Sequence, residues 1–438
     1  MPNHVPNPER RILIDWTSSS ATSSVTGIQR VVLRLIAAAQ SRERVEPQYS
    51  FLPVILSEGD IYEYRQRSIS SRASLPRKLL GQFDALMTRR LPRVRSALAQ
   101  AALRANVLSV LSAPRSKPVR GAPPYKPKAG DVLVLADATW LIPGWERAVE
   151  KFRKSGGKVV ALVYDVLPLT HPTFCSPVFS AAFENCIAAM TRQSDLFLSI
   201  SATSALEFTA LATKKAWRPD PFPPVKVIPL GSDFADQRHV AALERIAMEK
   251  QSQDLRSFAT SVDGFCLMVG SIESPRKNHV LVLEAMQRHW SKNGTMGLLI
   301  IGRPGWQSAE VIAQVRKLRK SGRPLLHLAN ATDCDLKAAY SKAACLLFPS
   351  LAEGFGLPIV EAISLGLPVL ASDIPVHREV GGSLVEYFPL GDAEILSQMI
   401  ARYAAQGREK ASIFGTSPRL PTWAECLESI AETIKLNL

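Results

Sequence analysis

Residues 347–382 constrain the fold of this chain most, because they predict a strand, a loop, a helix and a second strand in direct succession. A short apolar run ends at Phe348 and is followed by proline, as expected of a buried strand. The next loop contains Gly354 and Gly356, and glycines let a backbone approach a ligand closely. Pro358 suits the first turn of a helix. The succession predicts an α/β protein with a parallel, doubly wound sheet.

Two glutamates flank this loop. Glu353 lies beyond the carboxyl end of the predicted strand, and we place Glu361 in the first turn of the helix that follows. Both carboxylates then face one crevice, where open α/β sheets bind ligands. An ionised carboxylate only accepts hydrogen bonds, so it suits sugar and ribose hydroxyls. Acids near a helix start can also simply complement the helix dipole, which would be the preferred reading for Glu361 alone.

Two cations precede another predicted helix. Arg276 and Lys277 follow the predicted strand 265–270 and stand just before a helix beginning near residue 280. Cations at a helix N-terminus oppose the helix dipole unless an anion lies nearby. A departing diphosphate would satisfy both cations and the helix terminus, since negative charge grows on it. Arg303, at the end of the next predicted strand, is a weaker candidate for binding the same ligand.

The stretch PSLAEGFGLPIVEAISLGLPVLASD resembles the signature of family 4 glycosyltransferases, in which two glutamates lie seven residues apart. The resemblance is strong over residues 265–390, patchy over 12–36 and 130–232, and absent from 65–128. It implies an enzyme that retains the anomeric configuration of the transferred sugar. It also implies the GT-B fold, in which two Rossmann-like, doubly wound parallel-sheet domains face a cleft.

The resemblance further implies a nucleotide diphosphate sugar as substrate, no cofactor and no metal, with Lys277 and Arg276 neutralising the diphosphate. On the same basis we expect Glu353 to act on the transferred sugar and Glu361 to bind the ribose. The residues between them that are expected to contact this donor form the donor loop: Gly354, Phe355, Gly356 and Leu357. The family commonly has arginine after the strand-end glycine, where this chain has Ser271.

The first predicted strand, 11–16, leads through a Ser/Thr-rich loop into the segment TGIQR at 26–30. Gly27 stands where a helix N-terminus could hold an anion on backbone amides. The segment resembles that of a subset of the same glycosyltransferases. That resemblance places Arg30 on the acceptor side and favours a GDP-sugar, with mannose as a candidate.

Asp165 and His171 follow the carboxyl end of the predicted strand 158–165, which makes them acceptor-side candidates. Asp165 is assigned a catalytic role. The family often has histidine before this aspartate, where this chain has Tyr164. A lone histidine in a proline-rich loop is more often structural, so both readings of His171 stay open.

The chain divides into three expected parts. Residues 1–232 form an acceptor-side Rossmann-like domain with a basic insertion at 65–128. Residues 233–420 form the donor domain. Residues 421–438 form a helix that crosses back to the first domain, as the resemblance implies.

The basic insertion, residues 65–128, contains 15 Lys and Arg against one acid, so it carries the whole net charge of +14. Apolar residues recur at helical spacing over 79–98 with arginines between them, which favours docking on an anionic membrane. A helical lid with a solvated face is an equal alternative. Nucleic acid is not an expected partner, because no aromatic residue is interleaved with the arginines.

Six scattered cysteines without CxxC pairs and the lack of a long apolar run favour the cytoplasm. Peripheral attachment to the inner face of the cytoplasmic membrane is expected if the insertion binds lipid. The predicted function is a retaining, metal-independent hexosyltransferase that extends a bacterial surface glycan or a lipid-linked acceptor. Two alternatives stay open: another GT-B enzyme, such as a phosphorylase or sugar-nucleotide epimerase, and a non-catalytic glycan- or membrane-binding relative.

Overall fold

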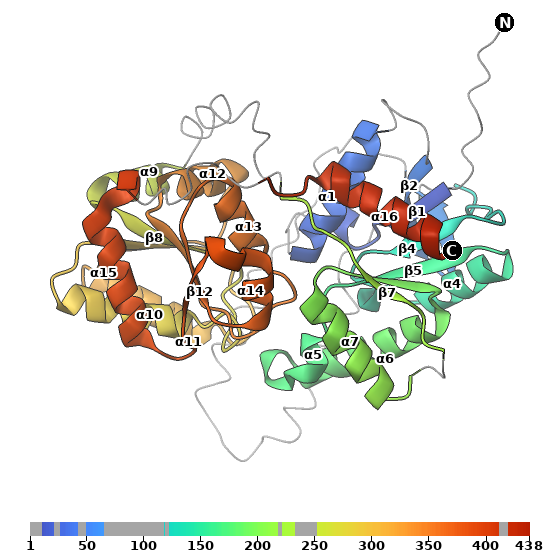
Figure 1. The fold of residues 1–438 in the computed structure, drawn as a ribbon, viewed down its shortest axis with the longest axis horizontal. Coiled ribbons are helices and arrows are strands. Elements are labelled where there is room, and N and C mark those ends of the chain that lie inside the picture. Colours follow the sequence, from blue (N-terminus) through green and yellow to red (C-terminus); the bar gives the residue numbers. More distant parts are fainter. Residues whose placement is uncertain are drawn as a thin grey trace, which may run out of the picture.

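The computed structural model describes residues 11–21, 27–42, 50–64, 118, 122–217, 221–232, 252–410 and 419–438. Two α/β halves, each built on its own sheet, are seen side by side (Figure 1). Most of the basic insertion lies outside the described residues, as does most of the helix expected between the halves. Nothing in the structure therefore bears on the membrane-docking prediction.

The first half contains a seven-stranded sheet with the order β3-β2-β1-β4-β5-β6-β7. All neighbouring pairs are parallel except β2 and β3. The strands are β1 (Arg11–Asp15), β2 (Ser50–Ser57), β3 (Asp60–Glu63), β4 (Val132–Leu135), β5 (Lys158–Val163), β6 (Leu196–Ser199) and β7 (Val225–Val227). The strand order reverses between β1 and β4, and this is the point where open α/β sheets bind ligands.

The edge strand β3 was not predicted from the sequence. It forms a hairpin with β2 through Glu58 and Gly59, both of which have positive φ angles. Two such residues match the tight turn whose twist suits a hairpin. A glutamate at the first position concealed this turn, because glutamate is not among the residues that usually adopt it.

The second half contains a six-stranded, fully parallel sheet with the order β10-β9-β8-β11-β12-β13. Its strands are β8 (Phe265–Val269), β9 (Gly297–Ile301), β10 (Leu325–Leu328), β11 (Cys345–Phe348), β12 (Val369–Ser372) and β13 (Glu386–Phe388). Every residue of β9, β11 and β12 is buried, as expected of strands covered on both faces. The order reverses between β8 and β11.

Helices cover both faces of each sheet (Figure 1). Those of the first half are α1 (Gly27–Arg42), α4 (Trp145–Lys154), α5 (Leu167–Thr170), α6 (Pro177–Gln193) and α7 (Ala202–Lys214). Those of the second half are α9 (Gln253–Ser261), α10 (His279–Ser291), α11 (Ala309–Lys320), α12 (Asp333–Lys342), α13 (Leu357–Ser364), α14 (Pro375–Gly381) and α15 (Ala393–Lys410).

The helix α16 (Trp423–Asn437) follows the second half in sequence but packs on the first sheet. Its apolar side chains, including Leu427 and Ile430, belong to the same core as Val32 and Leu35 of α1. Figure 1 shows α16 beside α1, on the half that contains β1 and β4. Thr422 and Glu425 form a capping box at its start. The core of the first half therefore includes residues from both ends of the described chain.

All six cysteines are free thiols, and four of them are buried. Within the described residues, no helix is both long and apolar enough to cross a bilayer.

Candidate active site

The loops that follow β8 and β11, the two strands at the reversal of the second sheet, bring the predicted donor residues together. Lys277 and Arg276 come from the first loop and Glu353 from the second. Lys277 Nζ donates to Glu353 Oε1, and Arg276 Nη1 donates to Glu353 Oε2 over 3.0 Å. The Glu353 side chain is 9% exposed, so this cluster is largely shielded from water. Residues separated by 76 positions thus form one charged centre.

Opposing effects set the pKa values in this cluster. Burial would raise the pKa of Glu353, but the charges of Lys277 and Arg276 outweigh it and lower the pKa to about 2. Burial lowers the pKa of Lys277, while Glu353 opposes that shift. Burial would also lower the pKa of Arg276, but Glu353 and Glu273 raise it overall. Glu353 is therefore an anion at neutral pH, held between two cations.

Backbone contacts fix the loop that carries the cations. The Leu351 amide donates to the Arg276 carbonyl over 2.8 Å, which ties the two loops directly together. Lys277 Nζ lies 5.2 Å from the centre of the Phe348 ring. A side chain at Gly302 would place its Cβ 1.7 Å from the carbonyl oxygen of Gly270, so only glycine lets β8 and β9 end this close together. These contacts hold both cations at the strand ends.

Asp165, from the first half, lies near the cluster. Burial raises the pKa of this carboxyl, and the charge of Arg276 opposes the shift. Asp165 Oδ1 also accepts from the Leu167 amide over 3.0 Å. Its approach to the donor loop is close, since a Cβ on Gly354 would lie 3.1 Å from the Asp165 Cβ. The loop that follows β5 thus lies directly against the loop that contains Gly354.

Glu361 occupies a different environment from Glu353. Tyr340 donates its hydroxyl proton to Glu361 Oε2 over 2.8 Å, and Arg30 Nη2 lies 2.5 Å from Oε1. Burial raises the pKa of Glu361, while Arg30 and Tyr340 oppose the shift. The prediction that Glu361 lies in the first turn was wrong. The helix begins at Leu357, which puts Glu361 one turn further on and 5% exposed.

The remaining loop residues join the halves. Phe355 and Leu357 pack against the core that contains α1 and α16, so the donor loop seals against the first half. Gly356 has a φ of 109°, a conformation that favours glycine, and it caps the start of α13.

Three predicted residues stand apart from the charged cluster. Gly27 is the first residue of α1 and has open space where a Cβ would lie. Arg303 has an exposed side chain, and its carbonyl accepts from the Ile272 amide. His171 stacks on Phe174 with 4.9 Å between ring centres, and its Nδ1 lies 2.9 Å from Thr170 Oγ1. No recorded contact joins these three to Glu353 within the described residues.

A buried carboxylate pair at the reversal point of the first sheet was missed. Asp15 ends β1 and Asp137 follows β4, and they are 0% and 2% exposed. Asp137 accepts from the amides of Ser18 and Ser19, while Asp15 accepts from Thr17. Burial and the charge of Asp137 raise the pKa of Asp15 to about 7. The signal was present, since each acid follows an apolar strand run, but their adjacency depends on strand order.

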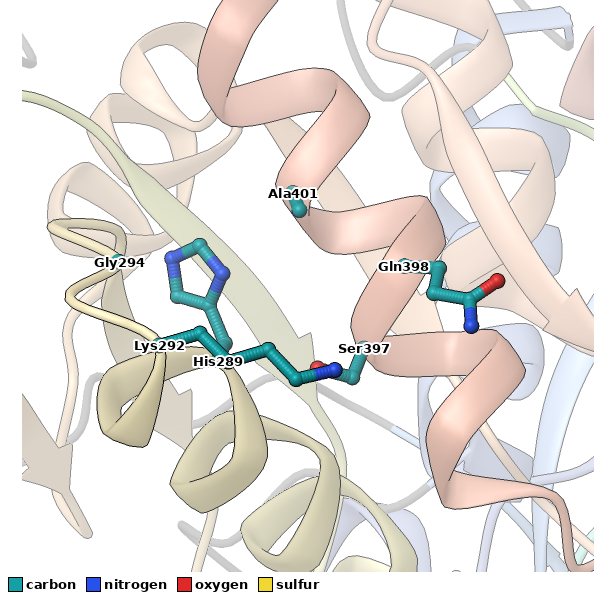
Figure 2. Close-up of a pocket in the computed structure, with 6 residues that line it drawn as sticks. All are labelled: His289, Lys292, Gly294, Ser397, Gln398 and Ala401. Carbon is teal, nitrogen blue, oxygen red and sulfur yellow. The ribbon is translucent and has the colours of Figure 1, made fainter.

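A cavity of about 250 Å³ lies elsewhere in the second half, between the end of α10 and α15 (Figure 2). His289, Lys292 and Gln398 are among its lining residues, and Lys292 extends towards Ser397. Lys292 Nζ pairs with Glu394 over 2.8 Å. None of the predicted site residues lines this cavity.

A much smaller cavity, about 20 Å³ and sufficient for one water, lies where the halves meet, beside Arg30, Arg34 and Glu361. In the described part of the chain, no group of three or more His, Cys, Asp or Glu side chains could hold a metal ion.

Comparison with known proteins shows which family the second half of the chain resembles. The model of "Glycosyl transferases group 1" matches residues 264–406, which contain the whole charged cluster around Glu353. The serotype-specific mannosyltransferase WbdA of Escherichia coli is 25% identical over 430 residues, covering 98% of this chain and 46% of that protein. The family resemblance recognised from the sequence is thereby confirmed over residues 264–406. The chain spans about half the length of the curated relatives it matches.

Solved structures share the fold of this chain. Anabaena Alr3699/HepE, in complex with UDP and glucose, gives a TM-score of 0.54 at 14% identity, covering 98% of this chain and 99% of that one. The α,α-trehalose 6-phosphate synthase of Burkholderia multivorans gives a TM-score of 0.58 at 12% identity and covers 98% of each chain. The predicted GT-B fold is confirmed.

Proposed function

We propose that this chain is a retaining hexosyltransferase that moves a sugar, with mannose the leading candidate, from a nucleotide diphosphate sugar to a surface glycan or lipid-linked acceptor. The charged cluster of Lys277, Arg276 and Glu353 at the reversal of the second sheet carries the proposal. The similarity of the chain to WbdA over nearly its whole length supports mannosyl transfer over the other activities of group 1 glycosyl transferases.

The cluster supplies what the departure of a diphosphate requires. Negative charge grows on the leaving group as the sugar departs, and fixed cations stabilise that charge most strongly where water is excluded. Lys277 and Arg276 are fixed in this way, since Glu353 and the backbone of the joined loops hold them in place. A bound diphosphate would compete with Glu353 for the two cations. The released carboxylate would then accept hydrogen bonds from the hydroxyls of the sugar.

The remaining predicted residues have roles consistent with their positions. Asp165 faces the donor loop from the first half, so it is proposed to contact the acceptor or the transferred sugar. Glu361 is proposed to bind the ribose, with Arg30 beside it. Retention would follow from attack on the face of the sugar that the diphosphate leaves, with the diphosphate helping to deprotonate the acceptor.

The test is a donor assay with a panel that includes GDP-mannose, UDP-glucose and UDP-galactose, in which released nucleoside diphosphate is measured with and without EDTA. We expect turnover of one donor, unaffected by the chelator, and a product with the anomeric configuration of the donor by NMR. Absence of turnover with every donor would contradict the proposal. Strict dependence on inorganic phosphate would favour a phosphorylase, and conversion of the nucleotide sugar without release of nucleotide would favour an epimerase.

A further inference from the structure

Two hydroxyls of the first half converge on one carbonyl of the donor loop. Ser201 Oγ donates to the carbonyl oxygen of Gly354 over 2.7 Å, and Ser204 Oγ donates to the same oxygen over 3.0 Å. Both serines are 1% exposed. Gly354 directly follows Glu353, so these bonds hold the peptide next to the anion of the charged cluster.

The fit of Gly354 leaves no room for another residue. A Cβ at this position would lie 2.4 Å from the carbonyl oxygen of Tyr164, at the end of the acceptor-side strand. Real Cβ atoms do not approach a backbone oxygen so closely, so the loop is seated directly against the first half. Glycine here serves close packing between two backbones.

A second set of contacts joins the start of α7 to another element of the second half, the helix α14, and again α7 supplies the donors. Glu379, from α14, accepts from the amides of Ala202 and Thr203 at the start of α7, over 2.5 and 2.9 Å, and from Thr203 Oγ1 over 2.7 Å. A carboxylate at a helix N-terminus satisfies amides that lack partners within the helix. The first turn of α7 therefore contacts the second half at two places. Its serine hydroxyls donate hydrogen bonds to the carbonyl of Gly354, and its backbone amides donate to the carboxylate of Glu379.

We propose that Ser201, Ser204 and Glu379 are positioning residues that set the orientation of Glu353 for the transfer reaction. The inference rests on the proposed function. Glu353 has its cations in the second half, but the carbonyl of the next residue, Gly354, is held by the first. The position of Glu353 therefore depends on contacts from both halves, and α7 links the first half to the donor loop.

Ser204→Ala is the cleanest variant, because it removes one bond to Gly354 and leaves the cap of α7 in place. Ser201 itself caps α7 by accepting from the Ser204 amide over 3.0 Å, so its loss would also weaken the helix. Thr209→Ala is the matched control, since its hydroxyl donates to Ala205 within the same helix and to no other group among the described residues. Glu379→Gln tests the second contact independently.

The kinetic test compares the effect of each substitution on kcat with its effect on the binding of nucleoside diphosphate. We expect Ser204→Ala to lower kcat for donor turnover by about 3- to 10-fold, as the loss of a single neutral hydrogen bond would. Binding of GDP, measured by calorimetry, should change less than about twofold, because Lys277 and Arg276 remain. Normal kcat in both Ser204→Ala and Glu379→Gln would overturn the inference.

A second readout does not depend on activity. Amide hydrogen exchange over residues 350–357 should be about 2- to 10-fold faster in Ser204→Ala than in the wild type, and unchanged in Thr209→Ala. Exchange in Ser204→Ala equal to that of the control would also overturn the inference. If the wild type turns over no donor but the exchange result holds, the proposed function fails while the coupling through α7 stands.

Discussion

Glu353 is the residue on which the charged cluster depends. It is an anion whose pKa of about 2 comes from two cations in the same half, and its ion pairs within the described residues are both with those cations. In the proposed mechanism the phosphates of the substrate would take the place of this carboxylate beside the cations. Single substitutions can therefore separate the role proposed at the leaving group from the role proposed at the sugar.

Lys277→Ala should lower the turnover of donor by about 10²–10³-fold, because one preorganised contact to the developing charge is lost. The protein should remain folded, since Arg276 still pairs with Glu353. Lys292→Ala is the control, as Lys292 is exposed and pairs with Glu394 on the surface. Steady-state kinetics and thermal unfolding should be measured together, and near-normal turnover in Lys277→Ala would reject the assignment.

Glu353→Gln and Glu361→Gln should differ. Glu353→Gln should lower kcat, because its proposed partner is the transferred sugar. It should not weaken binding of nucleoside diphosphate, because the carboxylate that competes for Lys277 and Arg276 is lost. Glu361→Gln should weaken that binding, because a neutral amide accepts hydrogen bonds from ribose hydroxyls less strongly than a carboxylate. Calorimetry with GDP and UDP measures the difference. Unchanged binding in Glu361→Gln would show that the ribose assignment is wrong.

Asp15 should make the protein less stable as the pH rises. Its pKa in the folded protein, about 7, lies above the ordinary value of 3.8, so the folded state holds a proton that the unfolded state has released. Stability should therefore decrease between about pH 4 and pH 7, by roughly 1–3 kcal/mol for this group. In Asp15→Asn the decrease should be smaller. Urea unfolding at pH 5 and pH 8 provides the comparison, and identical pH dependence in both proteins would contradict it.

At the scale of elements, the sequence predicted the strands and helices well where apolar periodicity was strong. The strands ending at Asp165 and Phe348 and the helix starts after Gly356 and Ser201 were predicted within a residue or two. The pairing of Glu361 with Arg30 was not predicted. It depends on how the two halves sit together, and no local pattern specifies that.

The helix α16 should contribute to the stability of the first half. Ile430→Ala removes a side chain that is 2% exposed in the shared core, and such truncations typically cost about 2–5 kcal/mol. Leu436→Ala, in the same helix but 83% exposed, should cost less than about 0.5 kcal/mol. Thermal or urea unfolding of both variants is the measurement. Equal stabilities would mean that α16 is not an integral part of the core.

At the scale of the whole molecule, charge is distributed unevenly, since the basic insertion, residues 65–128, has the same net charge as the entire chain. If this segment docks on a membrane, each basic residue near an anionic surface contributes about 1 kcal/mol. A third of its cations would then suffice for reversible attachment.

Vesicle sedimentation tests this prediction. Binding should occur on anionic vesicles at low salt and weaken at high salt, as the Debye length falls from about 10 Å at 0.1 M to about 3 Å at 1 M. Neutral vesicles serve as the control. Equal partitioning to both lipids, or no binding at low salt, would favour the alternative of a solvated lid.

The return of α16 to the first sheet has a consequence for biosynthesis. The N-terminus of a chain leaves the ribosome first, and domains usually fold in the order of their synthesis. Here the strands β1 to β7 emerge first, yet the face that α16 covers stays open until the whole second sheet has been made. The half that is synthesised first is therefore completed last, and its apolar face is open to chaperones throughout translation of the other half.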